Sequence, residues 1–404
     1  MNMNPLLTHA QSMPGYCEKK YSEPTVEIKQ KKTPYFFKVK SGVFCSTPVV
    51  SKNGSFVTGC DNANVYILSN TGAVLKTIPV DHDGDYYISS NPEISALPNT
   101  KPEQFVVTSY GDKIIIKFDI TGKIISKVKL DSFVTKPIAI SSTEYFVGES
   151  EGKVHFYIDD KSSVTIDLKT TSLNTPTTRN NSLGSKEVVI SDRNGNLFVL
   201  NDSGLLKTMK LSNVGLSNAL VAPDGLVWVS DETGIMNIVN VENQEIKTIK
   251  PGDAVKFSLP VFTKNGKIAF AGNEYIYIYD SKKLDQPESI FDFKFHERDY
   301  QSGAMNTYHG PLISGSILDI VEFDDGKEAI YVSTYGGFEL INTDGAIIGI
   351  YSFTAGDAEN YSLLNKLSDG SFIYGTYYGV DRISLHQNPS VSPIVSSAWG
   401  ACSH

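Results

Sequence analysis

Histidine, carboxylate and aromatic residues gather in three long stretches of the sequence that show no strand pattern, at residues 81–90, 293–309 and 354–361. A histidine beside a carboxylate could act as a general base, and Arg and Tyr suit contacts with anionic groups or a partner protein. No pattern supplies a nucleophile or a group to orient the base, so we expect binding rather than catalysis. The candidate binding residues are His82, Asp83, Asp85, Tyr86, His296, Glu297, Arg298, Asp299, Tyr300, Tyr308, His309, Asp357 and Glu359.

The first of these stretches also has some features of a calcium loop. The segment Asp81-His82-Asp83-Gly84-Asp85 places oxygen ligands at alternate positions with a glycine for the bend. It lacks the bidentate carboxylate that such a loop needs further along, because Tyr86 and Tyr87 follow instead. We interpret it as a turn and predict no metal site.

The elements that position these stretches are clearest between Glu187 and Leu211. Short apolar runs alternate there with turns, at residues 192–195 (DRNG) and 201–204 (NDSG). Runs of this length, divided by Asx and Gly residues that accept positive φ, are typical of antiparallel strands. Thr175-Pro176 begins the unit, because a strand can start at a proline without its missing N–H. The unit is a meander of four strands, labelled A to D.

The same meander recurs along the chain, and its aligned starts fall at residues 48, 92, 137, 176, 218, 260, 311 and 363. These starts are 39 to 52 residues apart. Four-stranded units at this spacing predict the blades of a β-propeller. Asp61, Asp112, Asp192 and Asp231 stand at or near equivalent B-to-C turns, and we interpret them as turn formers rather than ligands. The predicted fold class is all-β: a single eight-bladed propeller of four-stranded antiparallel blades.

The two ends of the repeat region predict how the propeller closes. Blade eight has no fourth strand after Leu385, and a lone strand, Thr33–Lys40, precedes blade one. Pairing the two would remove two open sheet edges. We therefore predict an N-terminal extension at 1–32, a propeller at 33–385 closed by its N-terminal strand, and a C-terminal tail at 386–404.

At this level of detail the repeats resemble a known family. Units with Pro-Val-Val, an apolar run, then Asp-x-x-Gly and a second apolar run ending in Asn/Asp-x-x-Gly are similar to PQQ-like β-propeller repeats. Eight of them with an N-terminal closing strand are similar to the BamB family of bacterial outer-membrane assembly factors. The resemblance covers residues 33–385 and implies a non-enzymatic scaffold. PQQ dehydrogenases place their cofactor against a tryptophan beside a vicinal disulfide; this chain has no Cys-Cys pair, and we predict no cofactor.

Composition limits the partners and the compartment. The 404-residue chain has a formal net charge of −9, which argues against nucleic acid as a partner. No apolar run reaches the ~18 residues of a transmembrane segment, and residues 1–16 lack the pattern of a signal peptide. We expect a monomer that is periplasmic or secreted, its export signal absent from this chain, with a cytoplasmic location as the alternative.

The four cysteines show no metal-binding spacing. Cys45 precedes strand A of blade one and Cys60 ends strand B, while Cys17 and Cys402 lie in the terminal segments. For an exported protein we predict the disulfides Cys45–Cys60 and Cys17–Cys402; free buried thiols are the alternative.

Two functions remain open. The favoured one is a non-enzymatic scaffold that binds a protein or peptide on one loop face, in the bacterial cell envelope. The alternative is a propeller that binds or acts on a carbohydrate or small molecule, as a lyase or hydrolase, through the histidine-rich D-to-A loops. An enzyme should bring at least two of His82, His296 and His309 near a carboxylate.

Overall fold

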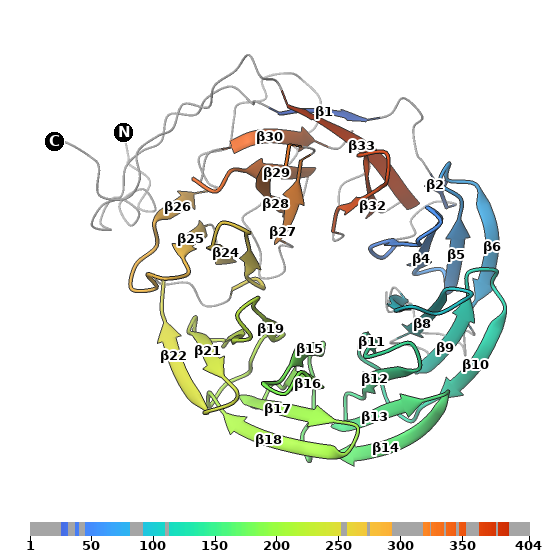
Figure 1. The fold of residues 1–404 in the computed structure, drawn as a ribbon, viewed down its shortest axis with the longest axis horizontal. Helices are drawn as coiled ribbons and strands as arrows, with labels where there is room; N and C mark the ends of the chain where they lie inside the picture. Colours follow the sequence, from blue (N-terminus) through green and yellow to red (C-terminus); the bar gives the residue numbers. More distant parts are fainter. Residues whose placement is uncertain are drawn as a thin grey trace, which may run out of the picture. The chain divides into compact units, whose positions relative to one another are not determined.

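The computed structural model contains β-strands and no helix in the part of the chain that it describes (Figure 1). The described residues are 26–30, 37–39, 45–80, 92–109, 113–251, 257–272, 275–292, 318–323, 325–334, 337–344, 347–352, 363–376 and 379–387. They form eight antiparallel sheets in chain order. The fold class predicted from the sequence is confirmed: an all-β, eight-bladed propeller of antiparallel blades, of which seven have four strands and the eighth has five in the described residues. Within these residues no helix is long and apolar enough to cross a membrane.

The chain divides into two compact units. The larger unit comprises Gln30–Lys250 and Tyr361–Ser384, and the smaller comprises Met1–Lys29, Pro251–Asn360 and Leu385–His404. Blades one to five and most of blade eight belong to the larger unit, and blades six and seven belong to the smaller.

Blades one to five are four-stranded meanders. In Figure 1 they follow one another along the larger unit, with the D strands β6, β10, β14, β18 and β22 on the outside. Their strands are, blade by blade, β3 (Val49–Val50), β4 (Phe56–Cys60), β5 (Asn64–Leu68), β6 (Val74–Pro79); β7 (Glu93–Leu97), β8 (Gln104–Ser109), β9 (Ile114–Asp119), β10 (Ile124–Lys129); β11 (Ile138–Ala139), β12 (Glu144–Gly148), β13 (Lys153–Ile158), β14 (Lys161–Asp167); β15 (Thr177–Asn180), β16 (Lys186–Ser191), β17 (Asn196–Asn201), β18 (Gly204–Lys210); β19 (Leu220–Val221), β20 (Val227–Ser230), β21 (Met236–Asn240), β22 (Glu245–Ile249).

Blades six and seven repeat the same order in the smaller unit. Their strands are β23 (Val261–Phe262), β24 (Lys267–Gly272), β25 (Tyr275–Asp280), β26 (Ser289–Asp292); β27 (Leu318–Glu322), β28 (Glu328–Thr334), β29 (Gly337–Ile341), β30 (Ile347–Ser352). The inner strand of blade seven begins at Leu318, later than the start predicted at residue 311. Residues 310 and 311 lie outside the described residues, and no proline marks the observed strand.

Blade eight contains β31 (Asn365–Lys366), β32 (Phe372–Thr376) and β33 (Gly379–Gln387), and it does receive N-terminal strands. Both β1 (Val26–Gln30) and β2 (Phe37–Lys38) pair with β33. Pairing therefore begins inside the segment expected to be an extension, and β33 runs beyond Leu385. The alternation of apolar and polar residues in Val26-Glu27-Ile28-Lys29-Gln30 is typical of a β-strand, but the lysines nearby concealed it.

Burial explains why the B and C strands stand out in the sequence. β9, a C strand, is buried at all of its positions, whereas the D strand β10 alternates between exposed and half-buried residues. B and C strands contact neighbouring blades on both faces and therefore need apolar residues throughout. Apolar clusters join successive blades within each unit; Val57 and Ile67 of blade one, for example, pack with Phe105 and Ile116 of blade two.

Candidate functional site

A three-residue loop recurs immediately before the inner strands. It places Ser, Thr or Asn two residues ahead of a buried Pro or Ala, and its copies are Ser46-Thr47-Pro48, Thr135-Lys136-Pro137, Asn174-Thr175-Pro176, Ser217-Asn218-Ala219 and Ser258-Leu259-Pro260. The first residue holds the end of strand B: the backbone N–H of Gly148 donates to Thr135 Oγ1 at 3.0 Å, and that of Ala271 to Ser258 Oγ at 2.9 Å. The loop is thereby fixed at both ends, by a hydrogen bond and by a buried ring or methyl group.

Hydrogen bonds between blades fix these loops relative to one another within the larger unit. The Asn174 side-chain amide donates to the carbonyl of Leu216 at 2.9 Å, and the backbone N–H of Thr175 donates to Asn218 Oδ1 at 3.0 Å. On the other side, the Thr108 hydroxyl donates to the Thr135 carbonyl at 3.0 Å. A side chain on one loop therefore keeps a defined position relative to side chains on the next blade.

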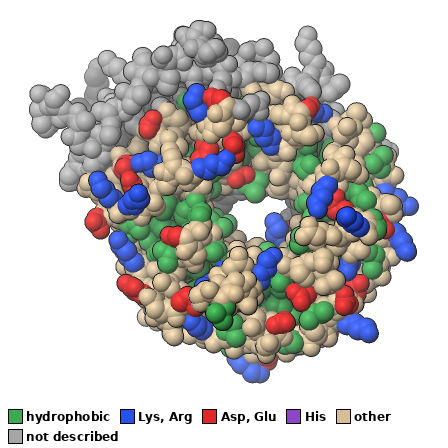
Figure 2. Space-filling view, viewed as in Figure 1, with side chains coloured by type: hydrophobic (Ala, Val, Ile, Leu, Met, Phe, Trp, Pro, Cys, Tyr) green, Lys and Arg blue, Asp and Glu red, His purple; other side chains and the backbone are tan. Residues whose placement is uncertain are grey.

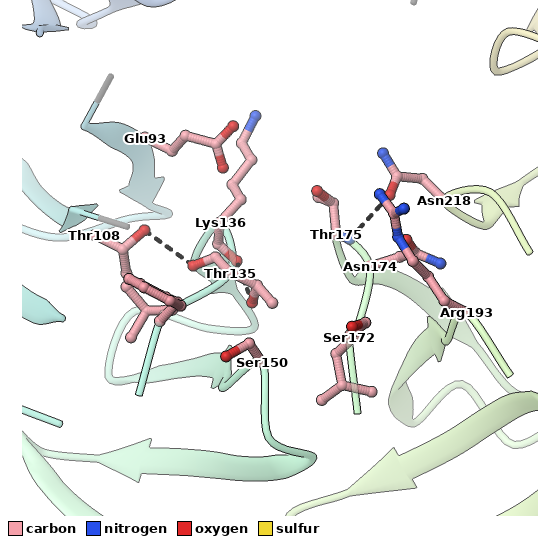
Figure 3. Close-up of a pocket in the computed structure, with 13 residues that line it drawn as sticks. Glu93, Thr108, Thr135, Lys136, Ser150, Ser172, Asn174, Thr175, Arg193 and Asn218 are labelled. Atoms are coloured by element: carbon pink, nitrogen blue, oxygen red, sulfur yellow. Dashed lines mark hydrogen bonds between the residues drawn. The ribbon is translucent and has the colours of Figure 1, made fainter. Parts of the chain in front are cut away.

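The middle residues of the first four of these loops line two hollows at the inner edges of the larger unit. The first hollow, of about 590 Å³, spans blades two to five (Figure 3). The second, of about 340 Å³, spans the inner edges of blades eight, one, two and three. Glu93 and Lys136 line both, so the hollows adjoin. D-to-A connections and B-to-C turns build this lining. We call the side of the blades that carries these connections and turns the loop face.

The lining is polar and carries more positive than negative charge. Among the described residues its charged side chains are Lys136, Arg193, Lys366 and Glu93, and hydroxyl and amide groups separate them. Figure 2 shows Lys and Arg side chains in blue and Asp and Glu side chains in red distributed over the face in view. Hydrogen-bond donors and acceptors alternating with cations are suited to recognising a polar ligand.

Glu93 and Lys136 extend toward each other across this lining (Figure 3). Glu93 keeps contact with water, but the surrounding protein desolvates it enough to raise the pKa of its carboxyl group; the nearby charge of Lys136 offsets part of that effect. The side chain of Arg193 is exposed on the B-to-C turn of blade four, close to Asn174 and Asn218 (Figure 3). Among the described residues it forms no ion pair.

Two of the four aspartates predicted to form B-to-C turns, Asp192 and Asp231, hold their turns by hydrogen bonds. Asp192 Oδ1 accepts the backbone N–H of Asn194 at 2.9 Å and that of Asn196 at 2.7 Å. Desolvation acts to raise the pKa of Asp231, but hydrogen bonds from Thr233, Ile235 and Ser212 outweigh it and lower that pKa. At Gly195 of the Asp192 turn, φ is +88°, and a Cβ would lie 2.0 Å from the Ser212 carbonyl oxygen, so no other residue fits. Asp112 lies outside the described residues.

The thirteen binding residues predicted from the sequence all lie outside the described residues, in 81–91, 293–317 and 353–362. They therefore stay predictions, as does the calcium-loop comparison at Asp81–Asp85. The test on His82, His296 and His309 stays open for the same reason. Cys45 and Cys60 form a disulfide across the first hairpin, with Cα atoms 4.0 Å apart, while Cys17 and Cys402 are not described.

The hollow itself was missed in the sequence because its residues come from separate repeats. A recurring Ser/Thr/Asn two positions before the strand-starting proline was the available signal. Among the described residues no three His, Cys, Asp or Glu side chains could hold a metal together, and the described lining of the hollows includes no histidine or cysteine.

The chain matches no protein-family model and no curated protein. Solved structures share its fold, among them Sqt1 and BamB. Sqt1 from Saccharomyces cerevisiae has a TM-score of 0.66 at 12% identity, covering 87% of this chain and 98% of Sqt1. BamB from Moraxella catarrhalis has a TM-score of 0.59 at 11% identity, covering 88% of this chain and 98% of BamB. The PQQ-like repeat assignment stays a prediction, whereas the predicted similarity to BamB is confirmed as a likeness of structure: the protein has the propeller fold of BamB and Sqt1.

Proposed function

We propose that this protein is a non-enzymatic interaction scaffold that binds a protein or peptide partner on the loop face built by its D-to-A connections and B-to-C turns. The observation that carries the proposal is the pair of adjoining polar hollows, whose loops are held by hydrogen bonds between blades. A rigid surface of this kind loses little conformational entropy on binding. The candidate residues of the stretches 81–90, 293–309 and 354–361 lie outside the described residues, and we propose them as further contacts for the partner.

We place this scaffold, as a monomer, in an oxidising compartment such as the bacterial periplasm. The disulfide between Cys45 and Cys60 supports that placement, because such bonds persist mainly outside the reducing cytosol. Thiol alkylation of the protein taken directly from its host should leave both cysteines unmodified. Alkylation of both cysteines before reduction would show that they are free thiols in the host, and we would then assign the protein to the cytoplasm.

The scaffold function is tested by photo-crosslinking in the native host. A photoreactive amino acid replaces Thr175, which lines the first hollow, or Leu183, which is 89% exposed in the A-to-B turn of blade four. Because strands alternate in direction, that turn lies at the other end of the blade. We expect a discrete protein adduct from position 175 and none from position 183. Adducts only from position 183 would show that the partner binds the face opposite the hollows, which contradicts the proposed binding face. The absence of adducts from both positions would reject the scaffold function.

A further inference from the structure

The two hollows differ in charge from the chain that forms them. The whole sequence carries a formal net charge of −9, yet the charged residues that line the two hollows in the described part of the chain are three cations and one carboxylate. An acidic protein that gathers cations on one concave face attracts anionic groups to that face and repels them elsewhere. The ligand chemistry indicated by the lining is therefore anionic.

The cations are distributed over several blades rather than gathered at one point. Lys366 comes from blade eight, Lys136 from blade three and Arg193 from blade four, and each belongs to a separate loop or strand end. A small anion needs only one such group. Cations spread along adjoining hollows, with amides and hydroxyls between them, fit an extended chain whose carboxylates are spaced along its length and whose peptide groups hydrogen-bond between them.

Arg193 is positioned for this role by the turn that carries it. The neighbouring Asp192 fixes the turn through backbone hydrogen bonds, and the Arg193 backbone N–H donates to the Ser172 carbonyl at 3.3 Å. The guanidinium makes no ion pair within the described chain and lies among Asn174 and Asn218 (Figure 3). A planar guanidinium with free donors matches a carboxylate through two parallel hydrogen bonds.

Glu93 limits how tightly this surface binds an anionic ligand. Its carboxylate faces Lys136 in a partly desolvated position, where it competes with any incoming anion for the ammonium group (Figure 3). Removing this one negative charge should therefore strengthen binding of an acidic ligand, which is an outcome that loss of folding cannot imitate.

We propose that the two hollows bind an extended acidic segment of a partner protein, with carboxylates of the segment on Arg193 and Lys136. This inference rests on the proposed scaffold function and names the chemistry of its partner. The negative charge of the whole chain favours a peptide over nucleic acid, whose dense phosphates would be repelled outside the hollow.

The test measures fluorescence anisotropy of a labelled peptide of twelve residues, alternating Glu with Gly and Ser, against the full-length protein. Arg193→Glu and Lys136→Glu should each weaken binding about tenfold or more, and Glu93→Gln should tighten it several-fold, because these changes alter charges facing the peptide. Lys161→Glu, on the exposed outer strand of blade three, is the matched control and should leave the Kd unchanged. Thermal melts of all four variants check folding.

Three competing probes decide the chemistry. A peptide with Gln in place of Glu should bind at least tenfold more weakly, since it keeps the shape and loses the charge. A phosphoserine peptide of the same length distinguishes phosphate from carboxylate as the recognised anion, and single-stranded DNA tests for a general anion surface. Equal binding of the Gln peptide, tighter binding of the phosphopeptide or DNA, no measurable binding of the Glu peptide, or no response to Glu93→Gln would each overturn the inference. A protein adduct at position 175 would leave the scaffold function standing in any of these cases.

Discussion

Blade three and blade seven each bury a glutamate, and the two side chains are in opposite electrostatic situations. Glu149 begins the B-to-C turn of blade three and is 2% exposed; Glu339 lies in β29 of blade seven and is 4% exposed. Burial of a carboxylate is costly in both places. The difference between them lies in the hydrogen-bond partners available.

Glu149 is surrounded by donors. Its Oε2 accepts the backbone N–H of Ser132 at 3.0 Å and the Ser132 hydroxyl at 2.9 Å, and its Oε1 lies 2.6 Å from His155 Nε2. Thr165 Oγ1 lies 3.0 Å from the other ring nitrogen of His155. Desolvation acts to raise the pKa of Glu149, but the hydrogen bonds from His155 and Ser132 outweigh it, so that pKa lies below its ordinary value.

Glu339 lacks a donor of this kind at its Oε2 in the described part of the chain. Its position in the sheet is opposite Val332 on one side and Ile350 on the other, and no hydrogen-bond partner for its Oε2 exists among the described residues. Desolvation by burial raises the pKa of Glu339 to about 7. The comparison shows that burial sets the cost of a carboxylate, while its hydrogen-bond partners decide whether its pKa rises or falls.

The largest effect should come from removing the satisfied glutamate. Glu149→Ala leaves His155 and the two Ser132 donors without their acceptor inside the blade, which should lower the free energy of unfolding by about 3–5 kcal/mol. Urea denaturation at pH 7 measures it. Glu151→Ala, in the exposed part of the same turn, is the control and should change little. A loss below about 1 kcal/mol for Glu149→Ala would mean that its hydrogen bonds contribute no more than those of an exposed pair.

Replacing the unsatisfied glutamate should have the opposite sign. The folded-state pKa of about 7 exceeds the unfolded value of about 4.3, so the unfolded state ionises first as pH rises and stability falls between those values. Glu339→Gln removes this loss and should raise the free energy of unfolding at pH 8 by about 3 kcal/mol. The gain should disappear at pH 4, where the carboxyl is protonated in both states. A variant that is no more stable than the wild type at pH 8 would show that Glu339 is ionised with a partner.

The acid side of the stability profile should distinguish the two residues again. Because the pKa of Glu149 is lowered in the folded state, its ionic stabilisation is present above the unfolded pKa of about 4.3 and is lost as pH falls through the folded value. The stability difference between the wild type and Glu149→Gln should therefore shrink as pH falls below about 4. Guanidinium melts from pH 3 to pH 7 measure this difference. A difference that stays constant over that range would contradict the lowered pKa.

The sequence could predict the blades because their B and C strands are buried on both faces. Short apolar runs such as Val188–Ile190, each followed by a turn with glycine, indicate such strands in the local sequence. The start predicted for blade seven, residue 311, lies outside the described residues, in which β27 begins at Leu318. The strand β1 was missed because its alternation of apolar and polar residues sits among lysines.

The hollow could not be predicted in the same way, because stacking of blades, and no local pattern, brings its charged residues together. Lys136 and Arg193 are 57 positions apart in the sequence, and Glu93 lies 43 positions before Lys136. The partners of Glu149 are similarly distant from any motif: nothing in the sequence around Ser132 or His155 distinguishes this acid from Glu339. The candidate residues were instead predicted from the three longest loops, at 81–90, 293–309 and 354–361.

The smallest predicted effect isolates one hydrogen bond of the satisfied glutamate. Ser132→Ala removes the hydroxyl donor to Glu149 but keeps the backbone N–H, so unfolding should become easier by about 1 kcal/mol. Ser212→Ala is the matched change in blade five, where Ser212 Oγ donates to Asp231 Oδ2 at 2.8 Å, and a similar loss is expected. Combining Ser132→Ala with Glu149→Gln in a double-mutant cycle then separates the coupling of the pair from the cost of each change. If the two losses add fully, the hydroxyl stabilises blade three by some route other than Glu149, and the contrast with Glu339 would rest on His155 and the Ser132 backbone alone.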